Sequence, residues 1–401
     1  MKDIVVIGSG PSGIIAALKA SKKNNVILLE KNDKIGKKIL VTGNGKCNLW
    51  NTNLFKEKLE IEKYYYTDDF TKLKKILEKK DQTYSYLTNE LGIFTKEKNT
   101  YIYPYSNTAT SIRETLERKL LNNKNIEVIL NFEAVKIEKK DNKFLVYNKN
   151  NEYYKCDKVV ISVGSKSSNL GTDSLDNLLG LTNIKINEEF PSLVPIKLEE
   201  KYLKDWNGIR CDVKLSLLVN NKKIKEEEGE IQLTDYGISG IVSFNLSGYI
   251  NRIKDEKYLE IDFMPDFKSD NELLNIFKLI NSSKTIEEVL ETLFNYKLLF
   301  IILKKSNIKK EKIWNDLKEE ELKNLINTIK HFKVKVKETL SFDRSQVTTG
   351  GISLKEIDDN LMLNKLKDIY VTGEILDVDG ICGGYNLAFA FITGFIVGEL
   401  C

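Results

Sequence analysis

The segment DIVVIGSGPSG, from Asp3 to Gly13, constrains the fold more than any other part of the chain. It is a short apolar run that ends in a glycine turn, which is typical of a buried strand in a parallel sheet. The next residues, IIAALKASKK, have the composition of a helix, and NVILLEK reads as a second strand. A strand, glycine turn, helix and strand form a βαβ unit, which predicts an α/β domain of the Rossmann type.

The turn itself is a complete G-x-G-x-x-G motif. The first glycine makes the turn, the second lets the backbone approach a pyrophosphate, and the third lets helix and strand pack closely. Glu30 ends the second strand, where an acid binds a ribose hydroxyl. The alternative is a tight turn with an ionised surface glutamate. The context favours a dinucleotide site, and its first candidate residues are Gly8, Gly10, Pro11, Ser12, Gly13, Glu30 and Lys31.

The far end of the chain favours FAD over NAD. Residues 368–373 read as a strand that ends in Gly-Glu, and a loop leads to Gly-Gly-Tyr-Asn at the start of an apolar helix. This layout resembles FAD enzymes of the glutathione-reductase type, whose late helix directs its N-terminus at the flavin. The alternative is that both glycine clusters are only caps and turns. Further FAD-binding candidates are Ala134, Val135, Gly164, Gly350, Gly351, Gly373, Glu374, Gly384, Tyr385, Asn386 and Leu387.

The stretch GKKILVTGNGKCN, from Gly36 to Asn48, follows the second strand. It can be a phosphate cradle, a redox-cysteine site or a flexible turn. The redox-pair interpretation fails because no second cysteine is near, and the turn interpretation weakens once both chain ends indicate a flavin. The stretch then predicts a backbone cradle and neighbours of the flavin, namely Lys37, Lys38, Gly43, Asn44, Gly45, Cys47 and Asn48.

Composition excludes several classes of chemistry. The single histidine, His331, leaves no basis for a Ser-His-Asp triad or a histidine metal cluster, so no metal site is expected. The five cysteines include no C-x-x-C pair, which favours a reduced chain. No signal peptide precedes the first strand, and the longest apolar run is too short to span a bilayer. We expect a cytoplasmic protein with no membrane association and no obligate protein partner.

The character of the sequence changes twice along the chain. Buried-strand patterns at both ends predict a discontinuous FAD-binding domain of residues 1–190 and 341–401. Strand patterns predict a β-rich insert of residues 191–265 and 332–340. Helical apolar spacing predicts a helical subdomain of residues 266–331.

Five motifs carry a resemblance to a known family: GKKILVTGNGKCN, FPSLVPIKL, LTDYGISG, TTGGISLKEID and TGEILDVDGICGGYNLAFAFITG. From first strand to last helix, the chain resembles the BaiN/RdsA-type NAD(P)/FAD-dependent oxidoreductases, also called YhiN-like or aminoacetone oxidase flavoproteins. The resemblance implies FAD in a discontinuous α/β domain with a β-barrel-like insertion and a helical subdomain. It also implies reduction of an activated C=C bond, with uridine in 23S ribosomal RNA or an unsaturated 3-keto bile acid as substrate.

The sequence departs from the family pattern at two positions. Many members have arginine where this chain has Lys46, and many have histidine where it has Asp235. A mechanism with that histidine as proton donor therefore cannot operate here. The remaining candidates for the catalytic acid are Cys47, Asp235 and Tyr236. A thiol such as that of Cys47, with an ordinary pKa near 8.5, can donate a proton near the flavin. For Cys47 the alternative is a small buried loop residue.

Three functions fit these observations. The leading one is an FAD-dependent enzyme that uses NAD(P)H to reduce uridine in ribosomal RNA. Because only one complete G-x-G-x-x-G is present, NAD(P)H is expected to bind transiently. The second is a reductase of a small unsaturated ketone, and the third is a non-catalytic FAD-binding protein. A net charge of +4 agrees with an RNA partner without requiring one. Tyr101, Tyr103 and Tyr105 can stack on a base or belong to a half-buried strand.

Overall fold

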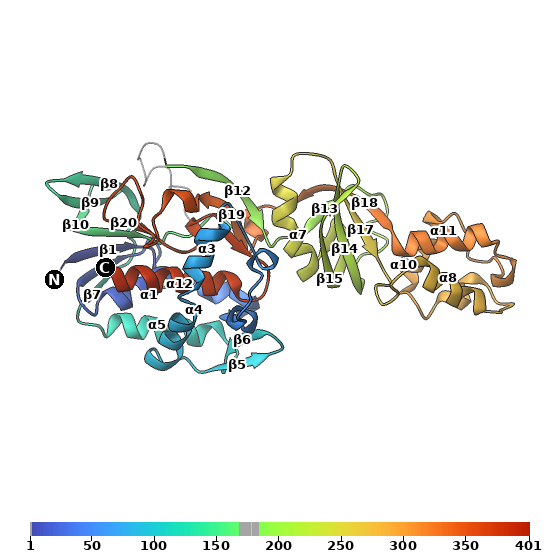
Figure 1. The fold of residues 1–401 in the computed structure, drawn as a ribbon, viewed down its shortest axis with the longest axis horizontal. Helices are drawn as coiled ribbons and strands as arrows, with labels where there is room; N and C mark the ends of the chain where they lie inside the picture. Colours follow the sequence, from blue (N-terminus) through green and yellow to red (C-terminus); the bar gives the residue numbers. More distant parts are fainter. Residues whose placement is uncertain (1, 168–177, 179–183) are drawn as a thin grey trace. The chain divides into compact units, whose positions relative to one another are not determined.

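The computed structural model describes residues 2–167, 178 and 184–401 of the chain (Figure 1). The chain forms two compact units, one of Met1–Phe190 with Gln346–Cys401 and one of Pro191–Ser345. The first unit is thus built from both ends of the chain. Residues 341–345, which the sequence places with the FAD-binding domain, lie in the second unit.

The first unit is organised around a five-stranded parallel sheet with the strand order β20-β11-β1-β2-β7. Its strands are short and apolar, and the central ones are almost completely buried, as is typical of a parallel sheet that is covered on both faces. The C-terminal strand β20 pairs with β11, which joins the two ends of the chain in one sheet. The predicted Rossmann-type fold is therefore confirmed. The strands are β1 (Asp3–Ile7), β2 (Asn25–Leu29), β7 (Ile126–Ile129), β11 (Lys158–Ile161) and β20 (Ile369–Val371).

Helices α1 (Pro11–Ala20) and α12 (Tyr385–Leu400) lie side by side against this sheet (Figure 1). Glycines on α12 permit the close approach: a Cβ atom at Gly394 would lie 2.2 Å from the Ser12 carbonyl oxygen, and one at Gly398 would lie 2.8 Å from that of Ala16. The apolar C-terminal stretch is thus a core helix. In the part of the chain that the structure describes, no helix is long and apolar enough to cross a membrane.

Smaller elements surround the sheet. An antiparallel sheet β3-β6-β5 and a second one, β10-β9-β8, flank it, and the pairs β12–β19 and β21–β4 complete the unit. Their bounds are β3 (Trp50–Asn51), β4 (Tyr65–Thr67), β5 (Thr95–Lys98), β6 (Tyr101–Pro104), β8 (Ala134–Lys140), β9 (Lys143–Asn148), β10 (Tyr153–Cys156), β12 (Ile186–Ser192), β19 (Val347–Ile352), β21 (Val378–Gly380), α2 (Lys37–Val41), α3 (Phe70–Leu77), α4 (Lys80–Ser85) and α5 (Ala109–Leu121).

The second unit contains a closed barrel with the strand order β13-β16-β15-β14-β17-β18. Barrel and helices share one hydrophobic core, in which Phe332 packs edge-on against Phe263 and close to Trp206. The division of this unit into a β-rich part and a helical part stays a proposal. The elements are β13 (Ile196–Leu198), β14 (Arg210–Val219), β15 (Lys222–Thr234), β16 (Gly237–Ser239), β17 (Lys257–Asp262), β18 (Phe332–Thr339), α7 (Ile241–Arg252), α8 (Asp270–Leu279), α9 (Ile286–Leu290), α10 (Tyr296–Lys305) and α11 (Glu319–Lys330).

Candidate cofactor site

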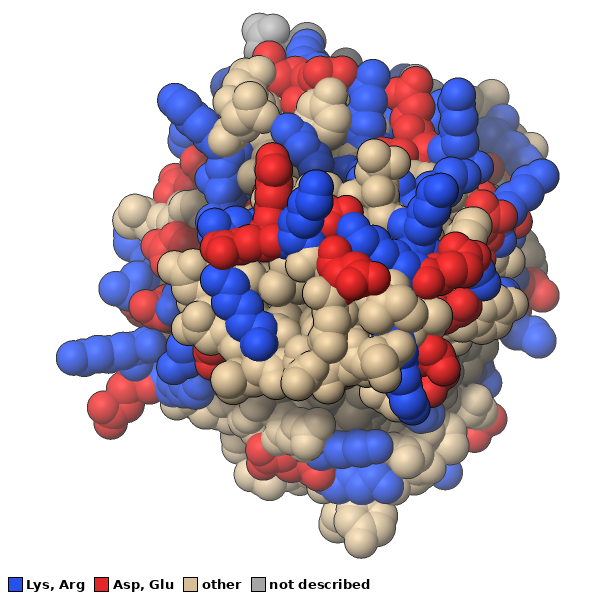
Figure 2. Space-filling view, turned by 90° about the vertical axis from the view of Figure 1, so that its right-hand side faces the viewer, with Lys and Arg blue, Asp and Glu red and all other residues tan. Residues whose placement is uncertain are grey.

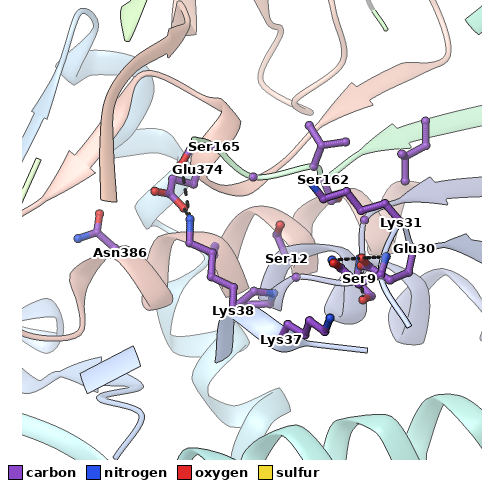
Figure 3. Close-up of a pocket in the computed structure, with 18 of the residues that line it drawn as sticks. Ser9, Ser12, Glu30, Lys31, Lys37, Lys38, Ser162, Ser165, Glu374 and Asn386 are labelled. Carbon is purple, nitrogen blue, oxygen red and sulfur yellow. Dashed lines mark hydrogen bonds and ion pairs between the residues drawn. The ribbon is translucent and has the colours of Figure 1, made fainter. Parts of the chain in front are cut away.

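A pocket lies in the first unit at the carboxyl ends of three parallel strands, β1, β2 and β11 (Figure 3). Ile7 ends β1 and Leu29 ends β2, and Gly8, Glu30 and Ser162 directly follow β1, β2 and β11. Open α/β sheets bind ligands at this edge because the strand ends and the following helix N-termini converge there. The fold thus places the G-x-G-x-x-G turn on the wall of a pocket.

Each glycine of the turn has a distinct surrounding. Gly8 has φ +100°, and a Cβ atom there would lie 2.4 Å from the Ser162 carbonyl oxygen. A Cβ atom at Gly13 would lie 2.0 Å from the carbonyl oxygen of Gly8, so helix α1 packs tightly on the strand. At Gly10 the nearest such atom is the same Ser162 oxygen at 4.0 Å, which leaves the backbone open toward the pocket. These are the roles that a pyrophosphate-binding turn requires.

The carboxylate of Glu30 is held in a fixed position at one end of the pocket. One oxygen accepts hydrogen bonds from the Ser9 backbone N–H (2.9 Å) and hydroxyl (2.5 Å). The other accepts from the backbone N–H (2.8 Å) and the side-chain amide (2.6 Å) of Asn32. These four donors fix the side chain and compensate for its burial, since Glu30 is only 7% exposed. An anchored acid beside a glycine turn is suited to accept hydrogen bonds from a ribose.

An ion pair crosses the middle of the pocket between Lys38 and Glu374 (Figure 3). Lys38 also donates to the Ser167 hydroxyl at 2.6 Å, and Glu374 accepts from that hydroxyl and from the Thr348 backbone N–H, each at 3.0 Å. Burial alone raises the pKa of Glu374, but Lys38 and these donors outweigh it and hold the pKa below its ordinary value. Lys37 instead pairs with Asp33 at 2.6 Å.

The N-terminus of α12 reaches the opposite end of the pocket, where Asn386 and Leu387 line the wall. The Asn386 side chain bonds to both the N–H and the carbonyl of Gly380, each at 2.8 Å, and thereby fixes the turn before the helix. Gly384 has φ +93°, and a Cβ atom there would lie 2.5 Å from the Trp50 carbonyl oxygen. The positive end of a sixteen-residue helix thus faces the pocket.

The donor set of the pocket fits an FAD molecule. Glu30 is placed for a ribose, the backbone from Gly8 to Ser12 is placed for a pyrophosphate, and Glu374 with the α12 N-terminus lies toward the other end. A Cβ atom at Gly164, which has φ +72°, would meet no atom of the described residues within 4 Å, so the wall is also open beside β11. The pocket thus contains an acid, accessible backbone and a helix N-terminus, which are the groups that bind a dinucleotide.

The structure brings about half of the predicted cofactor residues together. Those that line the pocket are Gly8, Gly10, Pro11, Ser12, Glu30, Lys31, Lys37, Lys38, Ala134, Gly164, Glu374, Asn386 and Leu387. Others support the walls from behind: Gly373 packs on Ser12, and Tyr385 is buried in a stack with Tyr64. The predicted residues outside the lining are Gly13, Gly43, Asn44, Gly45, Cys47, Asn48, Val135, Gly350, Gly351, Gly373, Gly384 and Tyr385.

The predicted cradle from Gly43 to Gly45 forms an exposed turn after α2, beside Thr42, which does line the pocket. Gly43, Asn44 and Gly45 all have positive φ, at 55°, 52° and 80°. Asn48 connects this loop to the second glycine turn, since a Cβ atom at Gly384 would lie 2.9 Å from its side-chain oxygen. The loop therefore lies next to the start of α12. This contact cannot be inferred from the sequence, because Asn48 and Gly384 lie near opposite ends of the chain.

Cys47 lies in the hydrophobic core of the first unit. Burial raises the pKa of its thiol to about 11, well above the ordinary value expected from the sequence, and a hydrogen bond with Thr42 offsets only part of this. The alternative interpretation, a small buried loop residue, describes its surroundings.

Asp235 and Tyr236 form the turn between β15 and β16 of the second unit. Asp235 is exposed and Tyr236 is half-buried, and the Tyr236 carbonyl accepts from the Leu198 N–H at 3.0 Å. Both stay proposed catalytic residues.

Several residues that line the pocket are not predicted from the sequence. Phe132 and Glu133 precede β8, and Gln346 and Val347 lie at the return of the chain to the first unit. None belongs to a glycine motif. The usable signal is position, since Ser162 and Ser165 directly follow a buried strand, where parallel sheets place their ligand-binding residues.

Comparison with known proteins shows the family of this chain. The model of the HI0933-like protein Rossmann domain matches residues 2–400. The 3-dehydro-bile acid delta(4,6)-reductase of Clostridium scindens is 33% identical, with 100% of this chain and 98% of that protein covered. The ribosomal RNA dihydrouridine synthase of Haemophilus influenzae is 26% identical, with 98% and 96% covered.

Two solved structures share the fold. A flavocytochrome c3 fumarate reductase matches with a TM-score of 0.50 at 15% identity over 99% of this chain and 77% of its own. A 3-ketosteroid-delta4-(5alpha)-dehydrogenase of Rhodococcus jostii matches with a TM-score of 0.50 at 12% identity over 99% and 96%. Fold and pocket together define a Rossmann-type, FAD-dependent oxidoreductase. The chain belongs to the HI0933-like family.

Proposed function

We propose that this protein reduces a carbon–carbon double bond conjugated to a carbonyl, with FAD in the described pocket and NAD(P)H as a transient reductant. The observation that carries the proposal is the pocket that joins Glu30, the glycine turn and the α12 N-terminus. The names of the two relatives support the chemistry, because a bile acid delta(4,6)-reductase and a dihydrouridine synthase both saturate such a bond. When bound, FAD supplies the two-electron redox chemistry that no side chain can supply.

The residues of this chain bind and orient the cofactor. Glu30 holds a ribose, the open backbone at Gly10 admits the pyrophosphate, and α12 stabilises negative charge at its N-terminus. The Lys38–Glu374 pair holds two charged side chains in the wall of the pocket.

The reduction adds a hydride to one carbon of the double bond and a proton to the other, and this proton needs an acid. None of the three proposed residues lines the pocket, and Cys47 is the least suited of them because burial raises the pKa of its thiol and makes it a weak donor. Asp235 and Tyr236 remain the better candidates, and single substitutions to Asn and Phe test them.

The leading substrate is uridine in 23S ribosomal RNA, and the ribosomal RNA dihydrouridine synthases among the relatives support it. Charge supports it only weakly: the face shown in Figure 2 carries positive and negative side chains interspersed, without a field of one sign. A small unsaturated ketone is the second candidate, favoured by the relative with 33% identity.

One experiment separates these functions. Purified FAD-loaded protein is incubated without oxygen with NADH or NADPH and either 23S ribosomal RNA transcript or an unsaturated 3-oxo steroid. We expect nicotinamide oxidation and dihydrouridine by mass spectrometry in the RNA sample. Steroid reduction without dihydrouridine would replace the first substrate with the second. Absence of flavin reduction by either nicotinamide would contradict the proposed use of NAD(P)H.

A further inference from the structure

The antiparallel sheet β3-β6-β5 has one face toward the core and one toward solvent. Ile102 and Pro104 on β6 are buried, and the residues between them point to the other side because side chains alternate along a strand. The register places Lys98 opposite Tyr101 and Lys96 opposite Tyr103, and partners in such a pair share a face. Tyrosines and lysines therefore meet on the outward face.

The same face continues beyond the last residue of β6. The Tyr105 backbone N–H donates to the Phe94 carbonyl at 2.8 Å, which extends the ladder by one more pair. The Lys96 ammonium lies 5.3 Å from the Tyr105 ring centroid, so both side chains occupy one side of the sheet. Phe94 is 83% and Tyr105 69% exposed. The tyrosine–lysine face thus consists of Phe94, Lys96, Lys98, Tyr101, Tyr103 and Tyr105.

We propose that the tyrosine–lysine face binds an unpaired segment of RNA by stacking bases on its rings and pairing phosphates with its lysines. Exposed aromatic rings on a sheet accept bases of any sequence, and flanking cations compensate the backbone charge. The charge on the face is complementary to RNA: its two ionised members are both lysines, and Glu97 falls on the opposite face with Ile102. This inference rests on the proposed function, whose substrate class it extends to a second contact.

One end of this face lies at the turn that opens helix α12. A Cβ atom at Gly383 would lie 2.8 Å from Cε1 of Tyr101, and the Asn51 amide donates to the Gly383 carbonyl at 2.9 Å. Residues just beyond, Asn386 and Leu387, line the cofactor pocket. RNA stacked on Tyr103 and Tyr105 can therefore continue along the sheet toward the flavin end of the pocket.

A second aromatic face in the same unit provides a matched control. Tyr147 and Tyr153 are cross-strand neighbours on β9 and β10, and the ammonium of Lys136 lies 5.5 Å from the Tyr147 ring centroid. Here, however, Glu138 pairs with Lys136 at 2.7 Å, so this lysine is already neutralised. The two faces have similar rings and differ in the carboxylate that accompanies the lysine.

The test measures fluorescence anisotropy of a labelled, uridine-containing single-stranded RNA with the FAD-loaded full chain. We expect Tyr103→Ala and Tyr105→Ala each to weaken binding about tenfold, the size of one lost base stack. Lys96→Gln with Lys98→Gln should lower the slope of log K against log salt by about 1.4, which corresponds to two phosphate contacts. Tyr153→Ala and Lys136→Gln should leave both quantities unchanged. FAD content and circular dichroism establish that every variant is folded.

The outcomes separate this inference from the proposed function. If wild-type protein and Tyr103→Ala bind and reduce RNA equally, the stacking site is wrong and the proposed function stands. If the face binds RNA but no uridine is reduced, the stacking site stands and the proposed function is wrong. A changed KM for the unsaturated ketone with unchanged RNA binding, or a changed oligomeric state alone, would also overturn the RNA site.

Discussion

The glycine turn Gly8–Gly13 packs against backbone, whereas the turn Gly43–Lys46 lies in solvent. In the first, a Cβ atom on Gly8 or Gly13 would collide with a carbonyl oxygen at 2.4 Å or less. In the second, the glycines have positive φ. A Cβ atom at Gly43 would lie 2.9 Å from the Asn48 backbone nitrogen, but one at Gly45 would come no closer than 4.0 Å to any atom of the described residues. Gly8 and Gly13 are thus required by packing, and Gly45 by backbone conformation.

This difference separates two ways in which a cofactor site uses glycine. The first turn is part of the fold, because sheet, helix α1 and turn all meet there before any ligand binds. The second costs the fold little and keeps exposed backbone beside Thr42 and the start of α12. We expect substitution of Gly8 or Gly13 to destabilise the fold and substitution of Gly45 to change ligand affinity.

The largest effect is expected for Gly8→Ala. The new methyl group would collide with the Ser162 carbonyl, and φ +100° is strained for alanine, so strand β1 and strand β11 must separate. We expect a loss of about 3 kcal/mol or more in the free energy of unfolding, together with loss of FAD. Urea unfolding and bound-flavin absorbance measure these.

Gly208→Ala is the matched control for Gly8→Ala. Gly208 has φ +90°, and a Cβ atom there would meet no atom of the described residues within 4 Å, so only backbone strain of about 1–2 kcal/mol applies. Equal losses at both positions would show that φ, and not contact with β11, makes Gly8 indispensable.

The second effect concerns Lys38, which shares the pocket with the first turn. Lys38→Met leaves the Glu374 carboxylate buried without its counter-ion, which should cost about 3 kcal/mol at neutral pH. The depressed pKa of Glu374 stabilises the wild-type fold above the ordinary value of 4.5, and this contribution is lost as pH falls through the lower folded value. Unfolding free energies between pH 3 and 7 should therefore fall toward acid in the wild type.

The variant Lys38→Met should behave in the opposite way, because protonation relieves an unpaired buried carboxylate. Its free energy of unfolding should rise as pH falls from 7. The double variant Lys38→Met with Glu374→Gln should recover much of the neutral-pH loss. If the double variant is no more stable than Lys38→Met, the ion pair is not the cause.

The sequence predicts the first turn better than the second, for a physical reason. Around Gly8–Gly13 the strand, helix and acid follow one another closely in sequence, so the local pattern identifies both the glycine turn and Glu30, although not the partners of Glu30, Ser9 and Asn32. The partner of Lys38, by contrast, is Glu374, which only the discontinuous sheet brings near. Long-range pairing of this kind leaves no local pattern.

Burial explains the remaining differences at the site. Cys47 and Tyr385 stand beside glycines in the sequence, as ligand-binding residues do, yet both side chains are buried in the core. Sequence neighbours share a position along the chain but not the direction of their side chains. The FAD-binding fold is therefore predictable from the βαβ motif, whereas the pocket lining requires the side-chain directions that the structure supplies.

A smaller effect is expected for Cys47→Ala, which lies at the end of the second turn. Loss of a buried sulfur should cost about 1 kcal/mol, while FAD and substrate reduction persist because the thiol does not line the pocket. Since the folded pKa is raised, the thiol's contribution is complete below the unfolded value of 9.0 and is lost as pH rises through about 11. Unfolding at pH 8 and 10.5 should show this loss in wild type and a smaller one in the variant.

Loss of substrate reduction in Cys47→Ala with normal FAD content would instead make this thiol the catalytic acid. Cys47→Ser serves as a size control, because its hydroxyl is similar in size to the thiol but a far weaker acid, so a catalytic thiol would be missed in this variant as well.

An equally small effect on stability, and the one that sharpens the comparison most, is expected for Gly45→Ala. Alanine meets no close atom of the described residues here, so the cost is the left-handed backbone at φ +80°, about 1 kcal/mol. If the exposed turn cradles the cofactor, FAD should dissociate faster although the fold persists. Flavin fluorescence on dilution measures the release rate, and Gly92→Ala, with φ +71° and equally open surroundings, controls for strain alone. Equal FAD release in both variants would mean that the second turn has no part in holding the cofactor, and that the first turn with Glu30 suffices.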